Sequence, residues 1–237
     1  MDGGIELVVM EEVGSTSDRL KVRAQSGAAE TALLARRQTA GQGRFGRAWW
    51  SGKGNLHLSV LLRPAVLVGP GRAPGHWAIL AGVALLEAVR SVAPAATLRL
   101  KWPNDLLLAG GKVAGVLVEA GFGDAASAPP WLVIGFGVNL VAAPPDLGRP
   151  AACLADTGAT PEAAAFGATV LAALLRWRGR YQREGFGPIR AAWLAAGPTS
   201  GETVAMSDGT AGTFAGMGDD GALLLQDGRA IRTGELA

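Results

Sequence analysis

The stretch KWPNDLLLAGGKVAGVLVE, residues 101–119, says most about how this chain folds. Pro103 has no backbone N–H and restricts the residue before it, so it ends the strand predicted over residues 97–101. The turn that follows holds the chain extended and presents Asn104 and Asp105 at the edge of a sheet. This arrangement indicates a ligand-binding position, and a plain Asn-Asp turn at the surface is the alternative.

Charged side chains around this turn suit a ligand that carries phosphate. Mg²⁺ prefers one or two carboxylates together with phosphate oxygens, and Asp105 fits that preference. Lys101 and Lys112 are cations that can neutralise phosphates or a carboxylate. Surface lysines beside a turn would give the same sequence, so this segment alone does not decide the chemistry.

A second polar segment, AGQGRFGRAWW at residues 40–50, lies upstream. Its glycines let the backbone approach a ligand closely, and successive N–H groups can form an anion-binding nest. Arg44 and Arg47 add forked donors for carboxylate or phosphate, and Trp49 and Trp50 offer an apolar wall. The spacing is not that of a P-loop. A surface loop with solvated arginines and a short RNA-binding segment are the alternatives.

A third segment, GFGVNL at residues 135–140, places two glycines at the end of an apolar strand. The side chain of Asn139 can form a hydrogen bond with a base, a sugar or a phosphate. Taken alone, this pattern is equally typical of an ordinary strand end.

The composition predicts a packed soluble protein. Of 237 residues, 49% are apolar and 18% are charged, with a formal net charge of +2. Cys153 is the single cysteine, and only His57 and His76 could join it, so a zinc cluster is not expected. The N-terminus lacks the basic segment of a secretory signal, and the longest apolar stretch, residues 77–86, is too short to span a bilayer. We expect a cytoplasmic protein that binds neither membrane nor nucleic acid.

Hydrophobic periodicity predicts strands and helices up to residue 198. Beyond that residue, short apolar runs are separated by Asp-Gly pairs. Strands are predicted over residues 5–13, 31–38, 56–62, 97–101, 113–119 and 131–137. Helices are predicted over residues 15–26 and 75–91, from Thr160 onward, and over residues 188–196. In the third helix, Thr160 is the expected cap and Pro161 the first helical residue. We predict a domain over residues 1–198 and, from its Asp-Gly turns, a small β-barrel-like domain over residues 199–237.

Together and in this order, the three segments resemble the biotin–protein ligase family. The motifs that carry the resemblance are Ser15–Thr16, GQGRFGRAW (41–49), KWPND (101–105), KVAG (112–115) and GFGVN (135–139). Gln42 stands where the family usually has arginine, and Ser17 replaces a common asparagine. Larger members carry an N-terminal helix-turn-helix that represses transcription, and we do not expect that function in this chain.

The resemblance implies an α+β fold. Its catalytic domain has a mixed, mainly antiparallel sheet packed with helices, like that of class II aminoacyl-tRNA synthetases. A small C-terminal SH3-like β-barrel follows it. The implied activity is ligation in two steps, in which ATP activates biotin to biotinyl-5′-AMP and a carrier lysine then takes the biotin.

The resemblance also assigns residues to roles. Lys112, Arg44 and Arg47 are expected to be catalytic, with Lys112 between the biotin carboxylate and the α-phosphate. The biotin-binding residues are expected to be Ser15, Thr16, Ser17, Gln38, Gly41, Gln42, Gly43, Arg44, Lys112 and Gly115. The ATP-binding residues are expected to be Arg47, Trp49, Lys101, Asn104, Asp105 and Asn139, and Asp105 is also the expected Mg²⁺ ligand. Leu58 is one candidate for the apolar wall behind biotin.

The implied partner is the biotin carboxyl carrier protein of acetyl-CoA carboxylase or a related carboxylase. A homodimer is compatible with the resemblance, and no segment of the sequence decides it. Two other functions stay open. One is a lipoate or octanoate ligase or transferase of the same fold, and the other is a binding module that senses biotin without catalysis.

Overall fold

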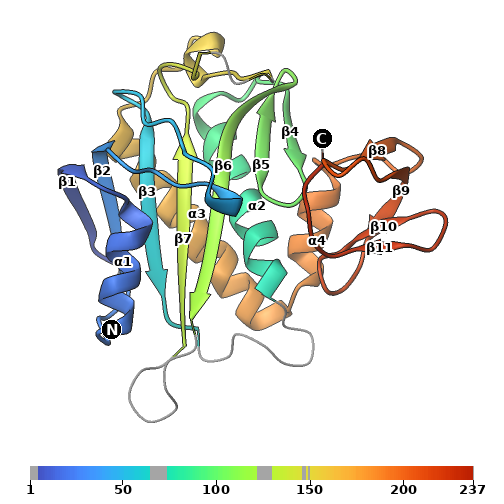
Figure 1. Ribbon diagram of the computed structural model, residues 1–237, viewed down its shortest axis with the longest axis horizontal. Helices are drawn as coiled ribbons and strands as arrows, with labels where there is room; N and C mark the ends of the chain where they lie inside the picture. The colour runs from blue at the N-terminus through green and yellow to red at the C-terminus, as the bar shows by residue number, and fades with distance from the viewer. Residues whose placement is uncertain (1–4, 65–73, 122–129, 146–147, 149, 237) are drawn as a thin grey trace.

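The computed structural model describes residues 5–64, 74–121, 130–145, 148 and 150–236 (Figure 1). A large sheet has the strand order β1-β2-β3-β7-β6-β5-β4, and a smaller terminal sheet has the order β11-β10-β9-β8. The strands of the large sheet are β1 (Leu7–Val13), β2 (Thr31–Gln38), β3 (Leu56–Leu62), β4 (Leu98–Lys101), β5 (Asp105–Leu108), β6 (Gly111–Gly121) and β7 (Trp131–Val138). The strands of the terminal sheet are β8 (Thr203–Ala205), β9 (Ala211–Met217), β10 (Leu223–Leu225) and β11 (Ala230–Ile231). The helices are α1 (Thr16–Gln25), α2 (Pro74–Val92), α3 (Ala163–Glu184) and α4 (Gly187–Leu194), with short 3₁₀ turns at Arg44–Gly46 and Leu154–Thr157.

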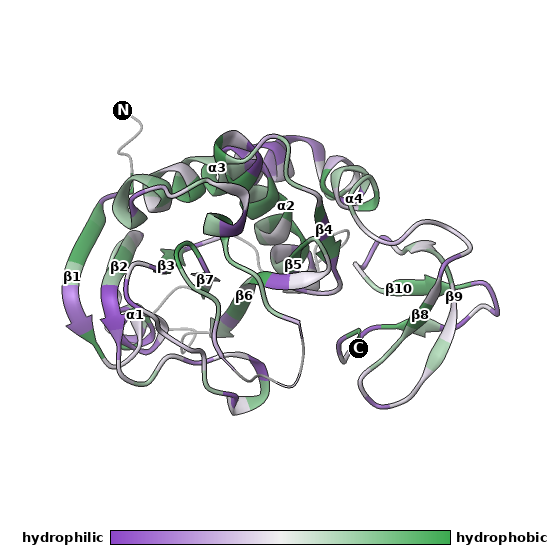
Figure 2. Cartoon of the chain, turned by 90° about the horizontal axis from the view of Figure 1, so that it is seen from above, coloured by the Kyte–Doolittle hydropathy of each residue, from purple (hydrophilic) through white to green (hydrophobic). Residues whose placement is uncertain are grey.

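Helices cover the large sheet on both faces. Seen from above, α1 lies on one face, and α2 and α3 lie on the other (Figure 2). Strands β1 and β2 run parallel, and every other neighbouring pair in the large sheet is antiparallel. The structure therefore confirms a mixed, mainly antiparallel sheet packed with helices.

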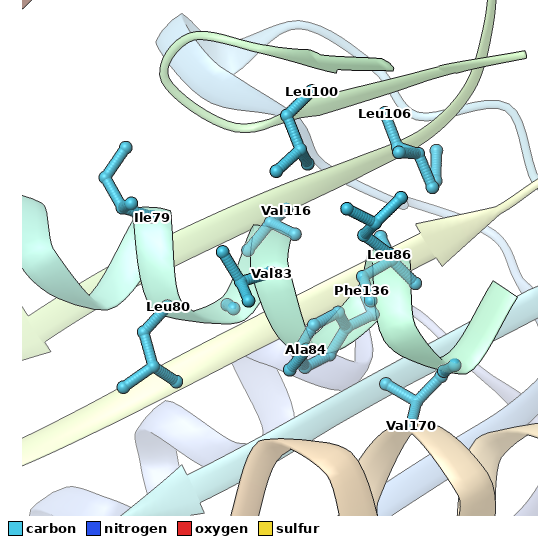
Figure 3. Packing of buried hydrophobic residues seen from close by; sticks show 14 of the residues in the cluster. Ile79, Leu80, Val83, Ala84, Leu86, Leu100, Leu106, Val116, Phe136 and Val170 are labelled. Atoms are coloured by element: carbon cyan, nitrogen blue, oxygen red, sulfur yellow. The ribbon is translucent and has the colours of Figure 1, made fainter. Parts of the chain in front are cut away.

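The alternation along β3 shows how the sheet divides the core. Leu56, Leu58, Val60 and Leu62 belong to the cluster that packs against α2 and α3, whereas Leu61 belongs to a separate cluster on the α1 side. All seven residues of β3 are buried because both faces are covered. Figure 3 shows the helix side of this core, where side chains of α2 meet those of the sheet.

Helix α2 is the most apolar helix of the fold. By length and composition its segment Gly75–Val92 could cross a membrane, and two thirds of that segment (67%) is buried inside the protein. Its packing against β6 and α3 accounts for its hydropathy, as expected for the core helix of a globular domain.

Two local predictions were wrong. Asp105 does not lie at a sheet edge, because the leucines that follow it form β5, which pairs with β4 and β6. Helix α3 begins at Ala163, and its cap is Glu162, whose carboxylate accepts a hydrogen bond of 2.9 Å from the Ala165 N–H. Thr160 is therefore outside the helix.

His76, near the start of α2, connects the terminal sheet to the helices. Its Nδ1 lies 2.9 Å from the Tyr181 hydroxyl, and its Nε2 lies 2.7 Å from the Asp219 carbonyl oxygen. The imidazole stacks on Phe186 with 3.8 Å between ring centroids and is 1% exposed. On the same side, the Trp102 indole N–H donates to the Gly221 carbonyl. The terminal sheet is thus held against α2 and the β4–β5 turn.

Candidate functional site

A cavity opens on the α1 face of the large sheet. The start of α1, the end of β2, the loop over residues 42–49 and strands β3, β5, β6 and β7 all contribute to its wall. Thirteen residues predicted from the sequence border it: Ser15, Thr16, Ser17, Gln38, Gln42, Gly43, Arg44, Arg47, Trp49, Asn104, Asp105, Lys112 and Gly115. Segments far apart in the chain therefore meet here, as the motifs predict.

Hydroxyl groups form one end of the cavity. Gln38 accepts hydrogen bonds from the Thr16 N–H (2.8 Å) and from the Thr16 hydroxyl (3.0 Å). Ser59 lies 2.7 Å from Thr16 Oγ1 and 3.0 Å from Ser17 Oγ. Ser15 caps α1 by accepting from the Asp18 N–H, as predicted. This end offers several adjustable donors and acceptors to a small polar ring.

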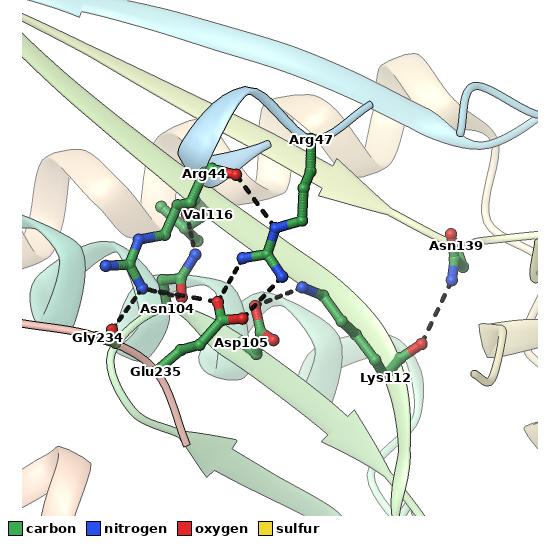
Figure 4. Close-up of polar contacts among 9 residues, drawn as sticks. All are labelled: Arg44, Arg47, Asn104, Asp105, Lys112, Val116, Asn139, Gly234 and Glu235. Carbon is green, nitrogen blue, oxygen red and sulfur yellow. Dashed lines mark hydrogen bonds and ion pairs between the residues drawn. The ribbon is translucent and has the colours of Figure 1, made fainter. Parts of the chain in front are cut away.

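Charged groups form the other end. Lys112 Nζ lies 2.6 Å from Asp105 Oδ1, and the two side chains are only 15% and 11% exposed. The lysine points into the cavity and faces the arginines of the loop (Figure 4). Because this position is shielded from water, a fixed cation here acts strongly on any anion placed beside it.

The two arginines converge on the same end from the loop side. Arg47 forms a bidentate pair with Glu235, with distances of 2.7 and 2.6 Å. Arg44 donates to the Gly234 carbonyl oxygen at 2.9 Å. Burial lowers the pKa of Arg44, whereas the hydrogen bonds from Arg47 lower the pKa of Glu235. Arg44, Arg47 and Lys112 thus meet with two carboxylates between them.

Glycines in two motifs seat the Trp49 indole. A Cβ on Gly137 would lie 2.3–2.6 Å from three indole atoms, and one on Gly115 would lie 3.2 Å from the same ring. The indole therefore lies flat on β6 and β7, with Lys112 Nζ 5.7 Å from a ring centroid. A side chain at Gly135 would similarly meet Ser17 Oγ at 2.8 Å. These glycines serve close packing of the wall itself.

A second cavity adjoins the first and has a more apolar lining. Trp50, Ala40 and Pro144 are among the residues that border it. Its wall shares Trp49 and Lys112, together with Gln38 and Ala48, with the first cavity. A ligand that extends through both cavities would therefore pass beside Lys112.

Three predicted residues do not border the first cavity. Gly41 borders the second, where a side chain would meet Gln38 Nε2 and the Trp49 carbonyl oxygen at 2.9 Å. Asn139 also borders the second, but it is 3% exposed and its amide donates to the carbonyl oxygens of Ala152 (3.0 Å) and Lys112 (3.4 Å). Asn139 thereby fixes the backbone that carries Lys112.

Lys101 does not join the group, so its predicted place beside the phosphates is not found. It lies on β4, the edge strand, one strand farther from the cavity than Asp105. It borders a hollow between the large sheet and the terminal sheet, with Arg99, Glu202 and Val204. The sequence could not show this, because it does not reveal that β5 intervenes.

Two polar residues of the wall, Ser59 and Glu235, escaped the sequence analysis. Ser59 alternates with the leucines of an apolar strand that holds one other polar residue, His57, and this alternation was an available signal. Glu235 carried no signal, because its position depends on how the terminal sheet packs. Leu58 borders the cavity, but it belongs to the core on the helix side, so Leu117 and Trp49 are better placed as the apolar wall.

Metal donors are sparse at this site. Within the described residues, no three His, Cys, Asp or Glu side chains gather as a metal-binding group. Asp105, whose Oδ1 lies 2.6 Å from Lys112 Nζ, and the neighbouring Asn104 are two oxygen donors in the wall. This set fits only an ion whose other ligands are phosphate oxygens and water.

Comparison with known proteins agrees with this geometry. Residues 9–139 match the model of the biotin/lipoate A/B protein ligase family. The chain is 40% identical over 205 residues to the biotin–[acetyl-CoA-carboxylase] ligase of Paracoccus denitrificans, covering 82% of this chain and 83% of that protein. It is 38% identical to the Mycobacterium tuberculosis enzyme of the same name, over 74% of this chain and 66% of that protein.

A solved structure gives the same result for the fold. The biotin protein ligase from Aquifex aeolicus, in complex with biotin and ATP, superposes with a TM-score of 0.81 at 28% identity. The match covers 98% of this chain and 97% of that one, so it includes the terminal sheet. The family model, the relatives and the superposition lead to one conclusion: this chain belongs to the biotin/lipoate A/B protein ligase family.

Proposed function

We propose that this protein is an ATP-dependent biotin–protein ligase. It activates biotin to biotinyl-5′-AMP and transfers the biotinyl group to a lysine of a carboxylase carrier protein. One observation carries the proposal: Lys112 lies in the wall between a cavity with hydroxyl groups at one end and a larger apolar cavity, with Arg44 and Arg47 opposite it. In this proposal the first cavity holds the biotin ring and the second holds the adenosine.

The geometry suits the first step. The biotin carboxylate attacks the α-phosphorus of ATP, and pyrophosphate leaves. Negative charge gathers on the phosphoryl oxygens in the transition state, where a preorganised cation stabilises it most. Lys112 is fixed by Asp105 at this junction, so it acts electrostatically and forms no covalent bond to the substrate.

The second step needs a protected intermediate. The acyl phosphate is reactive, so the loop that carries Arg44 and Arg47 has to exclude water until the carrier arrives. The carrier amine then attacks the acyl carbon, the bond to the phosphate oxygen breaks, and AMP leaves. The amine nitrogen gives its proton to solvent.

We also propose that Mg²⁺ accompanies ATP, with Asp105 and Asn104 as its protein donors. When bound, the ion would neutralise phosphate charge. A cytoplasmic location, a homodimer and the absence of a nucleic-acid partner are further parts of the proposal. Size-exclusion chromatography with and without biotin and ATP tests the oligomeric state.

Biotin-dependent exchange of pyrophosphate into ATP tests the function, followed by transfer to a purified carrier domain. Lipoate and octanoate are assayed in parallel, because the family includes lipoate ligases. Exchange with biotin alone supports the proposal. Exchange only with lipoate would reassign the substrate, and biotin binding without any exchange would leave a binding module.

Replacing Arg44 by glycine is expected to let the adenylate escape. The change removes the hydrogen bond to Gly234 and the contact with Asn104, so the loop loosens. Losing one charge-assisted bond suggests roughly tenfold faster labelling of lysines on a bystander protein, measured by streptavidin blot. Arg229→Gly, in a hairpin of the terminal sheet, is the control. Wild-type retention of the adenylate by Arg44→Gly would disprove the role of this arginine in closing the loop.

A further inference from the structure

The C-terminal segment that follows β11 contributes one side chain to the active cavity. Of the residues that border this cavity in the described chain, Glu235 alone comes from beyond residue 200. Its carboxylate accepts from both terminal nitrogens of Arg47 and lies 4.0 Å from a nitrogen of Arg44 (Figure 4). The adjacent Gly234 carbonyl accepts from Arg44. Both arginines of the loop thus meet the same short C-terminal segment.

The backbone around Glu235 is firmly held. The Ser207 N–H donates to the Glu235 carbonyl at 2.9 Å, and the Leu236 N–H donates to the Trp102 carbonyl at 3.3 Å. Leu236 is 8% exposed and belongs to the main hydrophobic core. The carboxylate is therefore presented from a fixed position that does not swing out of the cavity with the loop.

The arginine loop, residues 42–49, has weaker ties of its own. Its backbone bonds close it on itself, from the Gly43 N–H to the Arg47 carbonyl and from the Trp49 N–H to the Gly41 carbonyl. Phe45, at its tip, is 72% exposed and has a φ of 57°. In the part of the chain that the structure describes, side-chain hydrogen bonds join this loop to the rest of the protein at three residues: Gln42 donates to Asp18, Arg44 donates to Gly234 and Asn104, and Arg47 donates twice to Glu235. Three of these five bonds go to the C-terminal segment, Gly234 and Glu235, which therefore holds the loop more than any other segment does.

We propose that Glu235 is a positioning residue that fastens the arginine loop across the cavity and so keeps the adenylate enclosed. The consequence for the adenylate rests on the proposed function, whereas the fastening itself does not. It gives the C-terminal segment after β11 a direct part in the reaction, since Glu235 determines where Arg47 points.

Charge and geometry support this role over a passive surface pair. A bidentate arginine–carboxylate contact fixes orientation as well as distance, which a single lysine contact does not. Without the Glu235 carboxylate, the positive charges of Arg44, Arg47 and Lys112 would lie close together. Asp105 would be the one carboxylate left between them. Their mutual repulsion would then favour an open loop.

The test compares Glu235→Gln and Glu235→Asp with Glu202→Gln. Glu202 is the matched control, because it directly precedes β8 and also pairs with an arginine, Arg99 of β4, but does not border the active cavity. In the ligand-free proteins, trypsin cleavage after Arg44 and Arg47 measures loop opening. We expect cleavage to be about tenfold faster in Glu235→Gln than in the wild-type protein. In Glu235→Asp, which keeps the charge, the increase should be smaller, and in Glu202→Gln the rate should not change.

The second measurement is the half-life of bound biotinyl-5′-AMP, beside the rate of biotin-dependent pyrophosphate exchange. Glu235→Gln is expected to shorten the half-life about tenfold, whereas Glu202→Gln is expected to leave both the half-life and the exchange rate at wild-type values. The proposal would be overturned if Glu235→Gln were cleaved at the wild-type rate and kept the wild-type half-life of the adenylate. It would also be overturned if cleavage after Arg176 in α3 became faster by the same factor as cleavage after Arg44 and Arg47, because that would show global unfolding. If the wild-type protein forms no adenylate, the proposed function fails while the cleavage experiment still decides the fastening.

Discussion

Lys112→Ala is expected to slow adenylate formation at least a hundredfold in a single turnover. The side chain is held 2.6 Å from Asp105, is largely shielded from water, and borders both cavities. Removing one preorganised donor aimed at developing charge typically costs about 2.7–4 kcal/mol of transition-state stabilisation. Rapid-quench measurement of biotinyl-5′-AMP, with enzyme in excess over ATP, gives the rate directly.

Lys101→Ala is the matched control for this experiment. It removes a lysine from the same stretch of sequence, residues 101–119, but its side chain borders a different hollow, so adenylation should stay within about twofold. Because Lys112→Ala leaves the Asp105 carboxylate without its cation, thermal melting should accompany the kinetics. Lys112→Gln, which keeps the length of the side chain, separates charge from packing. A normal single-turnover rate in a folded Lys112→Ala protein would remove the catalytic role.

Gly137→Ala is expected to weaken biotin binding about tenfold or more. The added Cβ would lie 2.3 Å from Trp49 Cε2 and 2.6 Å from Nε1, so the indole has to leave its seat on β7. Overpacking of this kind typically costs about 1–3 kcal/mol, and here the displaced group is the wall between the two cavities. Titration calorimetry with biotin measures the affinity, and tryptophan fluorescence reports movement of the indole.

Two further variants keep this prediction specific. Gly187→Ala adds the same methyl group where no atom lies within 4 Å, so biotin affinity should not change. Trp49→Phe in the Gly137→Ala background removes most of the steric overlap and is expected to restore part of the affinity. Wild-type affinity and fluorescence in Gly137→Ala would show that the indole is not seated as described.

The sequence predicted the large sheet well because its strands are either long or clearly alternating. Residues 31–38 and 56–62 coincide with β2 and β3. For β3 the reason is plain, since Gly54 and Pro64 flank a strand in which leucines alternate with other residues. Strand β5 was missed because three leucines after a turn have no period of their own. The start of α3 was misplaced because a Thr-Pro pair resembles a cap, whereas the Glu162 side chain makes the actual bond.

The site was predictable where motif residues themselves form the wall. Ser15, Gln38, Arg44, Asp105 and Lys112 were all predicted, and all border one cavity. Lys101 was misplaced because strand order determines which cavity a side chain faces. Glu235 was missed because the docking of the terminal sheet brings it there across nearly 190 residues of chain. The sequence also did not reveal why glycine is needed at the motif positions 115 and 137. The reason is the packing of the Trp49 ring against them, which no sequence pattern predicts.

The buried imidazole of His76 has a consequence for how the protein melts. It joins a residue of α3 to a loop of the terminal sheet through hydrogen bonds at both ring nitrogens, within one continuous core. The terminal sheet therefore cannot unfold without breaking contacts with the helices of the main domain. Heating should unfold both sheets cooperatively, giving one calorimetric peak with equal van't Hoff and calorimetric enthalpies. Two resolved peaks would show that the two sheets unfold separately.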